Sequence, residues 1–177
     1  CLADVSEMAG GGGLPAGTMV GGTAGDMPIE GLRPGDRILA FTDEKLVQSE
    51  VKDIFRRRTM LLYVSTNRGR FVCARSHKVL TWNGFIEAEK LKLDDELAFM
   101  KEGRKAWAKI KSINKGKMGT VYNIETGPPH TYVANGFMVH NHGSWEGPAV
   151  TGRPWPYPLP LPASAVSAAL AELAARL

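Results

Sequence analysis

The sequence predicts an all-β domain, and three observations carry that prediction. Residues 17–141 contain many runs that are apolar or alternate between apolar and polar residues, which is typical of half-buried strands. Turn-forming pairs such as Asn83-Gly84 and Asn135-Gly136 separate these runs, and no long amphipathic helix interrupts them. A segment near residue 32 also recurs near residue 91. The 177 residues, 44% of them hydrophobic, suffice for one packed domain with an appendage.

Six segments are expected to form short strands because each is rich in apolar residues or alternates. Before them, the glycine run at residues 10–13 is expected to be a flexible loop, since glycine loses more backbone entropy on ordering than any other residue. The expected strands are residues 37–41, 61–66, 78–81, 96–100, 120–125 and 131–139.

An internal repeat predicts that the domain consists of two similar halves. Residues 32–41 resemble residues 91–99, with an offset of 59 residues at the start (32 to 91) and 58 at the end (41 to 99). The pair Ile29-Glu30 before the first copy resembles Ile86-Glu87 before the second. Two copies of one supersecondary unit in a small β domain indicate a pseudo-two-fold arrangement around a common core.

The composition changes after Asn141, so residues 1–141 are expected to be one domain and residues 142–177 a flanking segment. Proline occupies every second position from 154 to 162, which favours an extended polyproline linker. Ser164 then precedes an alanine-rich run with leucines at helical spacing, which predicts a short amphipathic helix at the end. A loosely ordered tail is the alternative.

Composition and charge argue against several classes of function. A net charge of +4 is too modest to indicate nucleic-acid binding, and no run reaches the roughly 18 apolar residues of a membrane span. Cys1 and Cys73 fit no disulfide framework or zinc spacing, so no cofactor or metal is expected, and Cys73 is expected to be buried. Arg56-Arg57-Arg58 is expected to be a solvated strand end. The protein is expected to be a monomer. The sequence leaves its compartment open, with a cytoplasmic location slightly favoured because no signal peptide is evident.

The most informative segment is residues 130–141, where Asn135-Gly136 lies between two β-prone runs and predicts a two-residue hairpin. If these two residues form the turn, the positions of each cross-strand pair sum to 271 (135 + 136), and His130 faces Asn141. Opposed side chains lie roughly 4.5 to 5.5 Å apart at Cβ. An imidazole so close to an asparagine amide could assist attack of the amide nitrogen on the asparagine's own carbonyl carbon.

That attack would close a succinimide and cut the chain after Asn141. The adjacent His140 could polarise the reacting carbonyl or protonate the leaving amine, and a positioned acid or base typically contributes about 10²- to 10⁴-fold in rate. The alternative is that His130 and His140 are ordinary strand histidines and that Asn141 merely ends the hairpin.

Together with these residues, several motifs resemble those of the Hint superfamily, which includes inteins, bacterial intein-like domains, Hedgehog autoprocessing domains and Hint modules of toxins. The resemblance covers residues 1–141 with the motifs in the family's order. It rests on Cys1-Leu2, Pro15-Ala16-Gly17-Thr18, residues 28–36, Cys73-Ala74-Arg75-Ser76-His77, Val121-Tyr122-Asn123, residues 130–136 and Val139-His140-Asn141.

The resemblance implies a compact pseudo-two-fold β fold and single-turnover autocatalytic cleavage, with the chain's own flanking segments as its partners. Cys1 would attack the preceding carbonyl in an N–S acyl shift, while His77 would protonate the leaving nitrogen. Asn141 would cyclise with help from His130 and His140.

Four departures from the family pattern refine this expectation. Ala74 replaces a threonine and Asn123 an aspartate, which predicts slower N-terminal cleavage and weaker coupling of the two steps. Residues 3–14 interrupt what would otherwise read Cys-Leu-Pro-Ala-Gly-Thr. Either this insertion loops out and returns Cys1 to the site, or the strand register is kept and Gly13 takes the nucleophile's position. Because His142 follows the asparagine, where ligation needs Cys, Ser or Thr, cleavage is favoured over ligation.

Two other functions remain open from the sequence. A degenerate, non-catalytic Hint module could display its C-terminal segment to a partner, which the departures favour and the intact C-terminal motif opposes. An amidohydrolase that uses Cys1 on an external substrate is the third reading, and the glycine run argues against it. Only 19 residues separate positions 100 and 120, which leaves no room for an inserted endonuclease domain.

Overall fold

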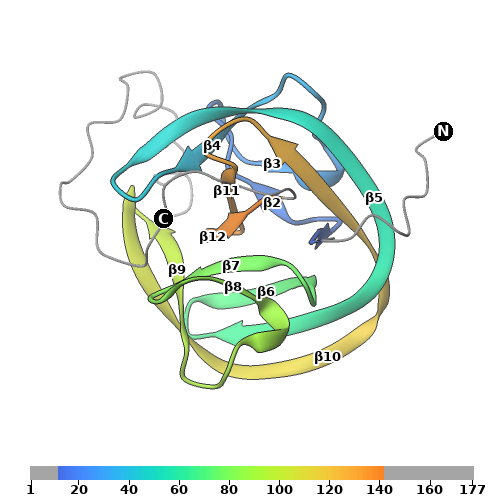
Figure 1. Ribbon diagram of the computed structural model, residues 1–177, viewed down its shortest axis with the longest axis vertical. Helices are drawn as coiled ribbons and strands as arrows, with labels where there is room; N and C mark the ends of the chain where they lie inside the picture. Colours follow the sequence, from blue (N-terminus) through green and yellow to red (C-terminus); the bar gives the residue numbers. More distant parts are fainter. Residues whose placement is uncertain (1–11, 142–177) are drawn as a thin grey trace.

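The computed structural model describes residues 12–141, which form an antiparallel β arrangement with two single-turn 3-10 helices (Figure 1). No helix in this part of the chain is long and apolar enough to cross a membrane. The strands and helices are β1 (Leu14–Pro15), β2 (Met19–Val20), β3 (Met27–Pro28), η1 (Ile29–Gly31), β4 (Arg37–Phe41), β5 (Leu46–Thr66), β6 (Gly69–Ala74), β7 (Lys78–Thr81), β8 (Gly84–Glu87), η2 (Ala88–Lys90), β9 (Glu96–Lys101), β10 (Arg104–Thr126), β11 (Thr131–Ala134) and β12 (Phe137–His140).

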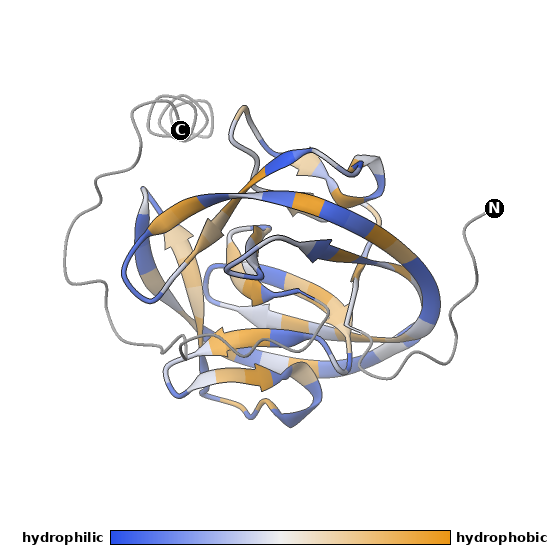
Figure 2. Ribbon diagram, turned by 45° about the horizontal axis from the view of Figure 1, so that its top comes forward, coloured by the Kyte–Doolittle hydropathy of each residue, from blue (hydrophilic) through white to orange (hydrophobic). Residues whose placement is uncertain are grey.

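Two long strands, β5 and β10, pair with each other and curve around the remaining elements (Figure 1). Their ladder runs from the Ile110↔Thr66 pair to the Thr126↔Val51 pair and contains three register shifts, which increase local twist and allow the ribbon to bend. Apolar and polar residues alternate along stretches of both strands, as expected where one face covers the core (Figure 2). The sequence predicts only one end of each long strand, at residues 61–66 and 120–125.

The pseudo-two-fold repeat is present, with one constant offset of 59 residues. η1 and η2 correspond (29 to 88), and the Arg37↔Glu50 pair of β4–β5 has its counterpart in the Glu96↔Lys109 pair of β9–β10. The expected shortening of the offset to 58 is therefore wrong, as is the match of Ile29-Glu30 to Ile86-Glu87. Ile29 corresponds to Ala88, because the buried position and the turn geometry repeat rather than the residue type.

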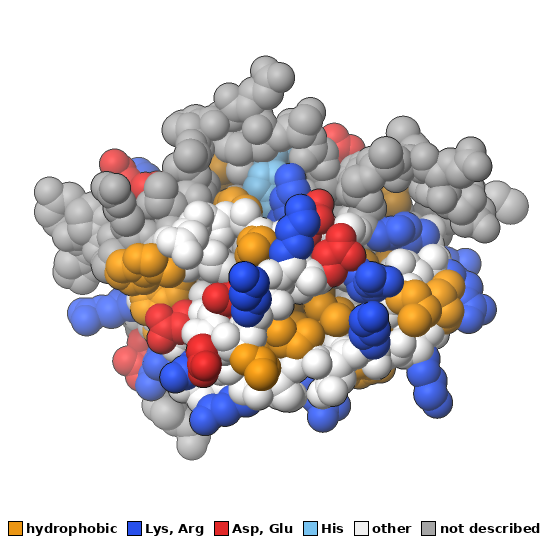
Figure 3. All heavy atoms as spheres, turned by 60° about the horizontal axis from the view of Figure 1, so that its bottom comes forward, with side chains coloured by type: hydrophobic (Ala, Val, Ile, Leu, Met, Phe, Trp, Pro, Cys, Tyr) orange, Lys and Arg blue, Asp and Glu red, His pale blue; other side chains and the backbone are white. Residues whose placement is uncertain are grey.

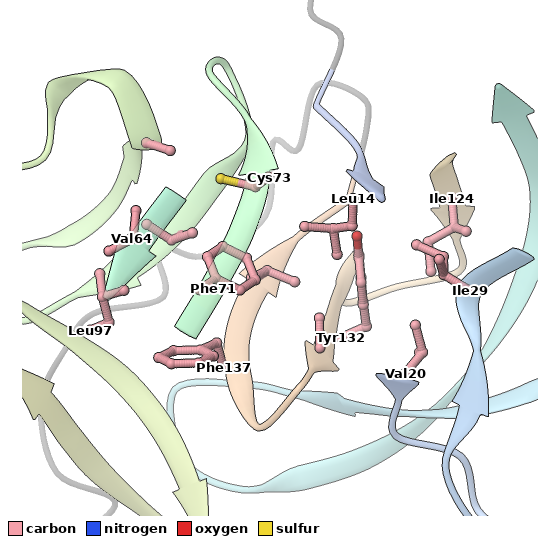
Figure 4. Close-up of a cluster of buried hydrophobic side chains, with 14 of the residues drawn as sticks. Leu14, Val20, Ile29, Val64, Phe71, Cys73, Leu97, Ile124, Tyr132 and Phe137 are labelled. Carbon is pink, nitrogen blue, oxygen red and sulfur yellow. The ribbon is translucent and has the colours of Figure 1, made fainter. Parts of the chain in front are cut away.

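The core lies between the two halves and includes residues from nearly every strand. The largest cluster of buried side chains contains Leu14, Phe71, Tyr132 and Phe137, which come from β1, β6, β11 and β12 (Figure 4). Both strands of the β11–β12 hairpin are buried throughout. The hairpin that ends at Asn141 is therefore held by packing on both faces, which fixes its register.

Several further expectations have outcomes in the structure. The strands predicted at residues 37–41 and 78–81 are confirmed with those bounds, and Cys73 is fully buried with a free thiol. Gly12 and Gly13, the last residues of the expected flexible loop, are buried. The expected polyproline linker, the C-terminal helix and the position of Cys1 lie outside the described residues.

Candidate active site

The β11–β12 hairpin has the register that Asn135-Gly136 predicts. Both turn residues have positive φ, 49° and 85°, as a type I′ turn requires. The ladder pairs Ala134 with Phe137 and Thr131 with His140, so positions sum to 271. One step further along, the Asn141 N–H donates to the His130 carbonyl at 2.9 Å. The predicted pairing of residues 130 and 141 is confirmed.

The amide of Asn141 is buried, and its hydrogen-bonding partners belong to Thr126 and His130. Its hydrogen bonds are satisfied when the amide oxygen accepts from the Thr126 N–H at 2.8 Å and from Thr126 Oγ1 at 3.1 Å, while Nδ2 donates to the His130 carbonyl at 3.0 Å. Half a turn of the amide would instead place Nδ2 3.1 Å from Thr126 Oγ1 and 3.5 Å from His130 Nδ1. The side chain of Asn141 is thus held in either orientation by the same two residues.

His130 is fixed by its own backbone and by Thr126. It has a φ of 63°, in the left-handed region, which directs the residue into the site just before β11 begins. Its Nδ1 donates to the Thr126 carbonyl at 2.8 Å, because a carbonyl can only accept. Thr126 therefore contacts both His130 and Asn141, although nothing in the sequence pattern singles it out.

His140 contacts the carbonyl of the bond that would be cut. Its Nδ1 donates to the Asn141 carbonyl oxygen at 2.8 Å, and its ring packs edge to face with the ring of Phe85, with centroids 5.0 Å apart. Burial lowers the pKa of His140, and the charges of Lys78 and His130 lower it further. The hydrogen bond to Asn141 acts in the opposite direction and raises the pKa, but the net shift is downward. The imidazole is consequently neutral at pH 7, with its hydrogen on the nitrogen that faces the carbonyl.

His77 lies close to the C-terminal residues but contacts a different peptide. β12 pairs with β7 at Val139↔Val79, so the antiparallel register directs the Asn141 end of β12 toward the His77 end of β7. Burial, together with the charges of His140 and Arg57, lowers the pKa of His77 to about 3. The neutral ring accepts at Nδ1 a hydrogen bond of 3.0 Å from the Gly13 N–H.

Gly13, and not a cysteine, is the residue held against His77. Of the two registers open to the N-terminal segment, the one that places Gly13 beside the histidine is the one observed. Leu14 and Pro15 follow as β1, paired with Tyr122 and Val121 of β10. The structure therefore brings together His77, His130, His140 and Asn141, and Cys1 is outside the residues it describes.

Arg57 is a site residue that the sequence analysis missed. It was expected to be solvated with Arg56 and Arg58, but only those two neighbours are exposed. Arg57 points the other way, and its Nη2 and Nε lie 3.2 and 3.4 Å from the Gly12 carbonyl oxygen. The signal was available, because three consecutive residues of a strand cannot all face the same side.

Comparisons with known proteins show the family to which the chain belongs. Residues 19–147 match the family model described as the pretoxin HINT domain, which is well over half of the chain. The chain belongs to this family.

The fold of this Hint domain is shared with solved inteins and with a bacterial intein-like domain. A DnaB intein from Synechocystis sp. PCC 6803 is 22% identical with a TM-score of 0.70, and the match covers 74% of this chain and 99% of that one. A bacterial intein-like domain from Clostridium thermocellum is 27% identical with a TM-score of 0.66, covering 73% and 98%. The gp41-1 intein is 24% identical with a TM-score of 0.65, covering 74% and 99%. A search of curated proteins found no match.

The Hint domain also carries the two departures noted in the sequence. Ala74 has no side-chain donor, and its backbone N–H donates to the Gly13 carbonyl at 2.9 Å. Asn123 is buried, and its Oδ1 has no hydrogen-bond partner within the described residues. No three His, Cys, Asp or Glu side chains of residues 12–141 are grouped so that they could hold a metal ion.

Proposed function

We propose that this Hint domain cuts its own chain after Asn141 by cyclisation of that residue. The observation that carries the proposal is the hydrogen bond of 2.8 Å from His140 Nδ1 to the Asn141 carbonyl oxygen. It polarises the carbonyl that the Asn141 amide nitrogen must attack, and it is aimed at the atom on which negative charge develops.

The proposed reaction balances within the chain. Asn141 Nδ2 attacks the Asn141 carbonyl carbon, the bond from that carbon to the nitrogen of His142 breaks, and a succinimide closes at the new C-terminus. One hydrogen leaves Nδ2 and one is gained by the amine of His142, so no water enters. Cleavage rather than ligation is proposed because His142 has no side chain that could retain an upstream chain as an ester or thioester.

The contacts around the amide support roles for His130 and Thr126. In the orientation with Nδ2 3.5 Å from His130 Nδ1, the imidazole can receive the amide's proton in the tautomer that carries its hydrogen on Nε2, which gives up the hydrogen bond to the Thr126 carbonyl. Thr126 Oγ1, 3.1 Å from the same amide atom, restricts rotation of the side chain. Holding the reacting groups near each other in this way lowers the barrier, because folding has already removed part of the conformational freedom that the reaction would otherwise have to remove.

The sequence also predicts an N–S acyl shift at Cys1 with His77 as the acid. That step stays a prediction, because Cys1 lies outside the described residues and His77 Nδ1 already accepts from Gly13.

Intact-mass spectrometry of the purified chain incubated at neutral pH tests the proposal. Residues 142–177 should be released from the native chain and from an Asn114→Ala control, whose asparagine is exposed on β10, but not from Asn141→Ala. An unchanged mass in all three would favour the non-catalytic display module instead.

A further inference from the structure

The peptide between Gly12 and Gly13 is held by hydrogen bonds at its polar atoms. Arg57 donates to the Gly12 carbonyl, and the Gly13 N–H donates to His77 Nδ1 at 3.0 Å. The next carbonyl, that of Gly13, accepts from the Ala74 N–H at 2.9 Å. Three consecutive polar groups of one short backbone segment are thus bound by groups from β5, β6 and the turn before β7.

Only glycine fits this site at both positions. A Cβ on Gly12 would lie 2.6 Å from His77 Nδ1, and a Cβ on Gly13 would lie 2.7 Å from Cγ2 of Val121. Gly13 also has a φ of 135°, a conformation that residues with a side chain rarely adopt. Because His77 and Val121 belong to the buried interior, neither can move aside cheaply.

A peptide held in this way lacks what an acyl shift needs. The shift requires a nucleophilic side chain on the residue whose nitrogen leaves, since sulfur or oxygen must reach the preceding carbonyl through a five-membered ring. Gly13 has no side chain. Cys1 could act here only by displacing Gly13 from His77, against the hydrogen bonds of the site and the pairing of Leu14 with Tyr122 in β1–β10.

We propose that the His77 site is a peptide clamp, which binds the diglycyl backbone of residues 12–13 and holds the upstream chain uncut. The ligand is this backbone itself. The Gly12 carbonyl accepts from the Arg57 guanidinium, the Gly13 N–H donates to the His77 imidazole, and neither glycine has a side chain. Processing is then one-sided, and the domain stays joined to whatever precedes residue 12. The clamp does not depend on cleavage after Asn141, so either can hold if the other fails.

A nucleophile challenge tests whether the upstream chain stays attached. The full chain, fused to an upstream carrier protein, is incubated with hydroxylamine and separately with a thiol, and intact masses are followed. Both reagents intercept a thioester, so a clamp predicts that no carrier is released. Carrier released with a hydroxamate or thioester at its C-terminus would show that Cys1 reaches the site and would overturn the proposal. Loss of residues 142–177 is read from the same spectra and reports separately on Asn141.

Nuclear magnetic resonance of the labelled chain tests the clamp directly. A nitrogen–nitrogen scalar coupling between the Gly13 amide and His77 Nδ1 is expected across their hydrogen bond, and its absence would overturn the proposal. Arg57→Gln should increase hydrogen exchange at the Gly13 amide by about 10- to 100-fold, as expected for loss of a charged hydrogen bond. Arg58→Gln, exposed on the same strand, is the matched control and should change it less than about 2-fold. Equal effects of the two variants would contradict a role for Arg57.

Discussion

Replacing His140 with alanine is expected to slow cleavage after Asn141 by about 10²- to 10³-fold. His140 Nδ1 is the donor that contacts the Asn141 carbonyl oxygen, at 2.8 Å, and the side chain is only 6% exposed. In such a buried place water does not substitute readily for the missing donor. Removing one positioned donor from a developing oxyanion typically raises the barrier by about 2.7–4 kcal/mol, and that range gives the expected factor.

The His140 variant also loses packing, so a second variant separates the two effects. Phe85 contacts the same imidazole, edge to face at 5.0 Å, but has no polar atom. Phe85→Leu removes part of this packing and keeps the donor. It should therefore lower the free energy of unfolding while leaving the cleavage rate within about 10-fold of native, whereas His140→Ala should affect the rate far more.

The assay is a time course of intact mass, with folding of each variant checked by urea denaturation. A cleavage rate for folded His140→Ala within about 2-fold of native would refute the reasoning, since no donor effect of the expected size could then exist.

Three other changes follow from the site and its support. Thr126→Val should slow release of residues 142–177 by about 10-fold, because the valine keeps the backbone N–H but loses the hydroxyl that hydrogen-bonds the Asn141 amide. Thr126→Ser should stay near the native rate, and equal rates for both variants would contradict the positioning role. Gly136→Ala should lower the free energy of unfolding by about 1–3 kcal/mol, because φ of Gly136 is 85° and the new Cβ would lie 2.5 Å from the Phe99 ring. An unchanged urea midpoint would contradict this prediction. The free energy of unfolding should fall as the pH drops below about 6.5 toward 3, because the unfolded chain binds a proton at His77 and the folded chain, in which the pKa of His77 is about 3, does not. For one such group the free energy of unfolding changes by about 1.4 kcal/mol per pH unit. Urea midpoints that stay constant from pH 7 to pH 4.5 would contradict that assignment.

Much of the fold could be predicted from the sequence because its signals are local. The pair Asn135-Gly136 determines a turn type, the turn determines the register, and the register places His130 opposite Asn141. The two halves were recognisable from their repeated residues. The long strands were harder, since the polar runs at 46–60 and 104–119 carry little apolar signal. Their extent depends on distant partners: residues 46–60 pair with β4 and with residues 118–126, and residues 104–119 pair with β9 and with residues 59–66.

The rest of the site depends on distant contacts that no short pattern encodes. Thr126 and Arg57 become site residues only because β5 and β10 curve around the hairpin (Figure 1). The sequence left open whether Cys1 or Gly13 takes the nucleophile's position. The structure places Gly13 there, where the backbone lies too close to His77 and Val121 for a residue with a side chain. On the face shown in Figure 3, lysine and arginine side chains lie among aspartate and glutamate, so charge marks no single region of that face as functional.

The chemical identity of the new C-terminus tests the central claim most directly. The chain is incubated in ¹⁸O-labelled water, and the fragment that ends at Asn141 is weighed at early times. Cyclisation predicts a fragment one water lighter than the product of hydrolysis and free of ¹⁸O, because the Asn141 amide nitrogen supplies the new bond. A fragment that carries ¹⁸O in a terminal carboxylate from the earliest times would show that water cuts the bond, and would contradict the mechanism.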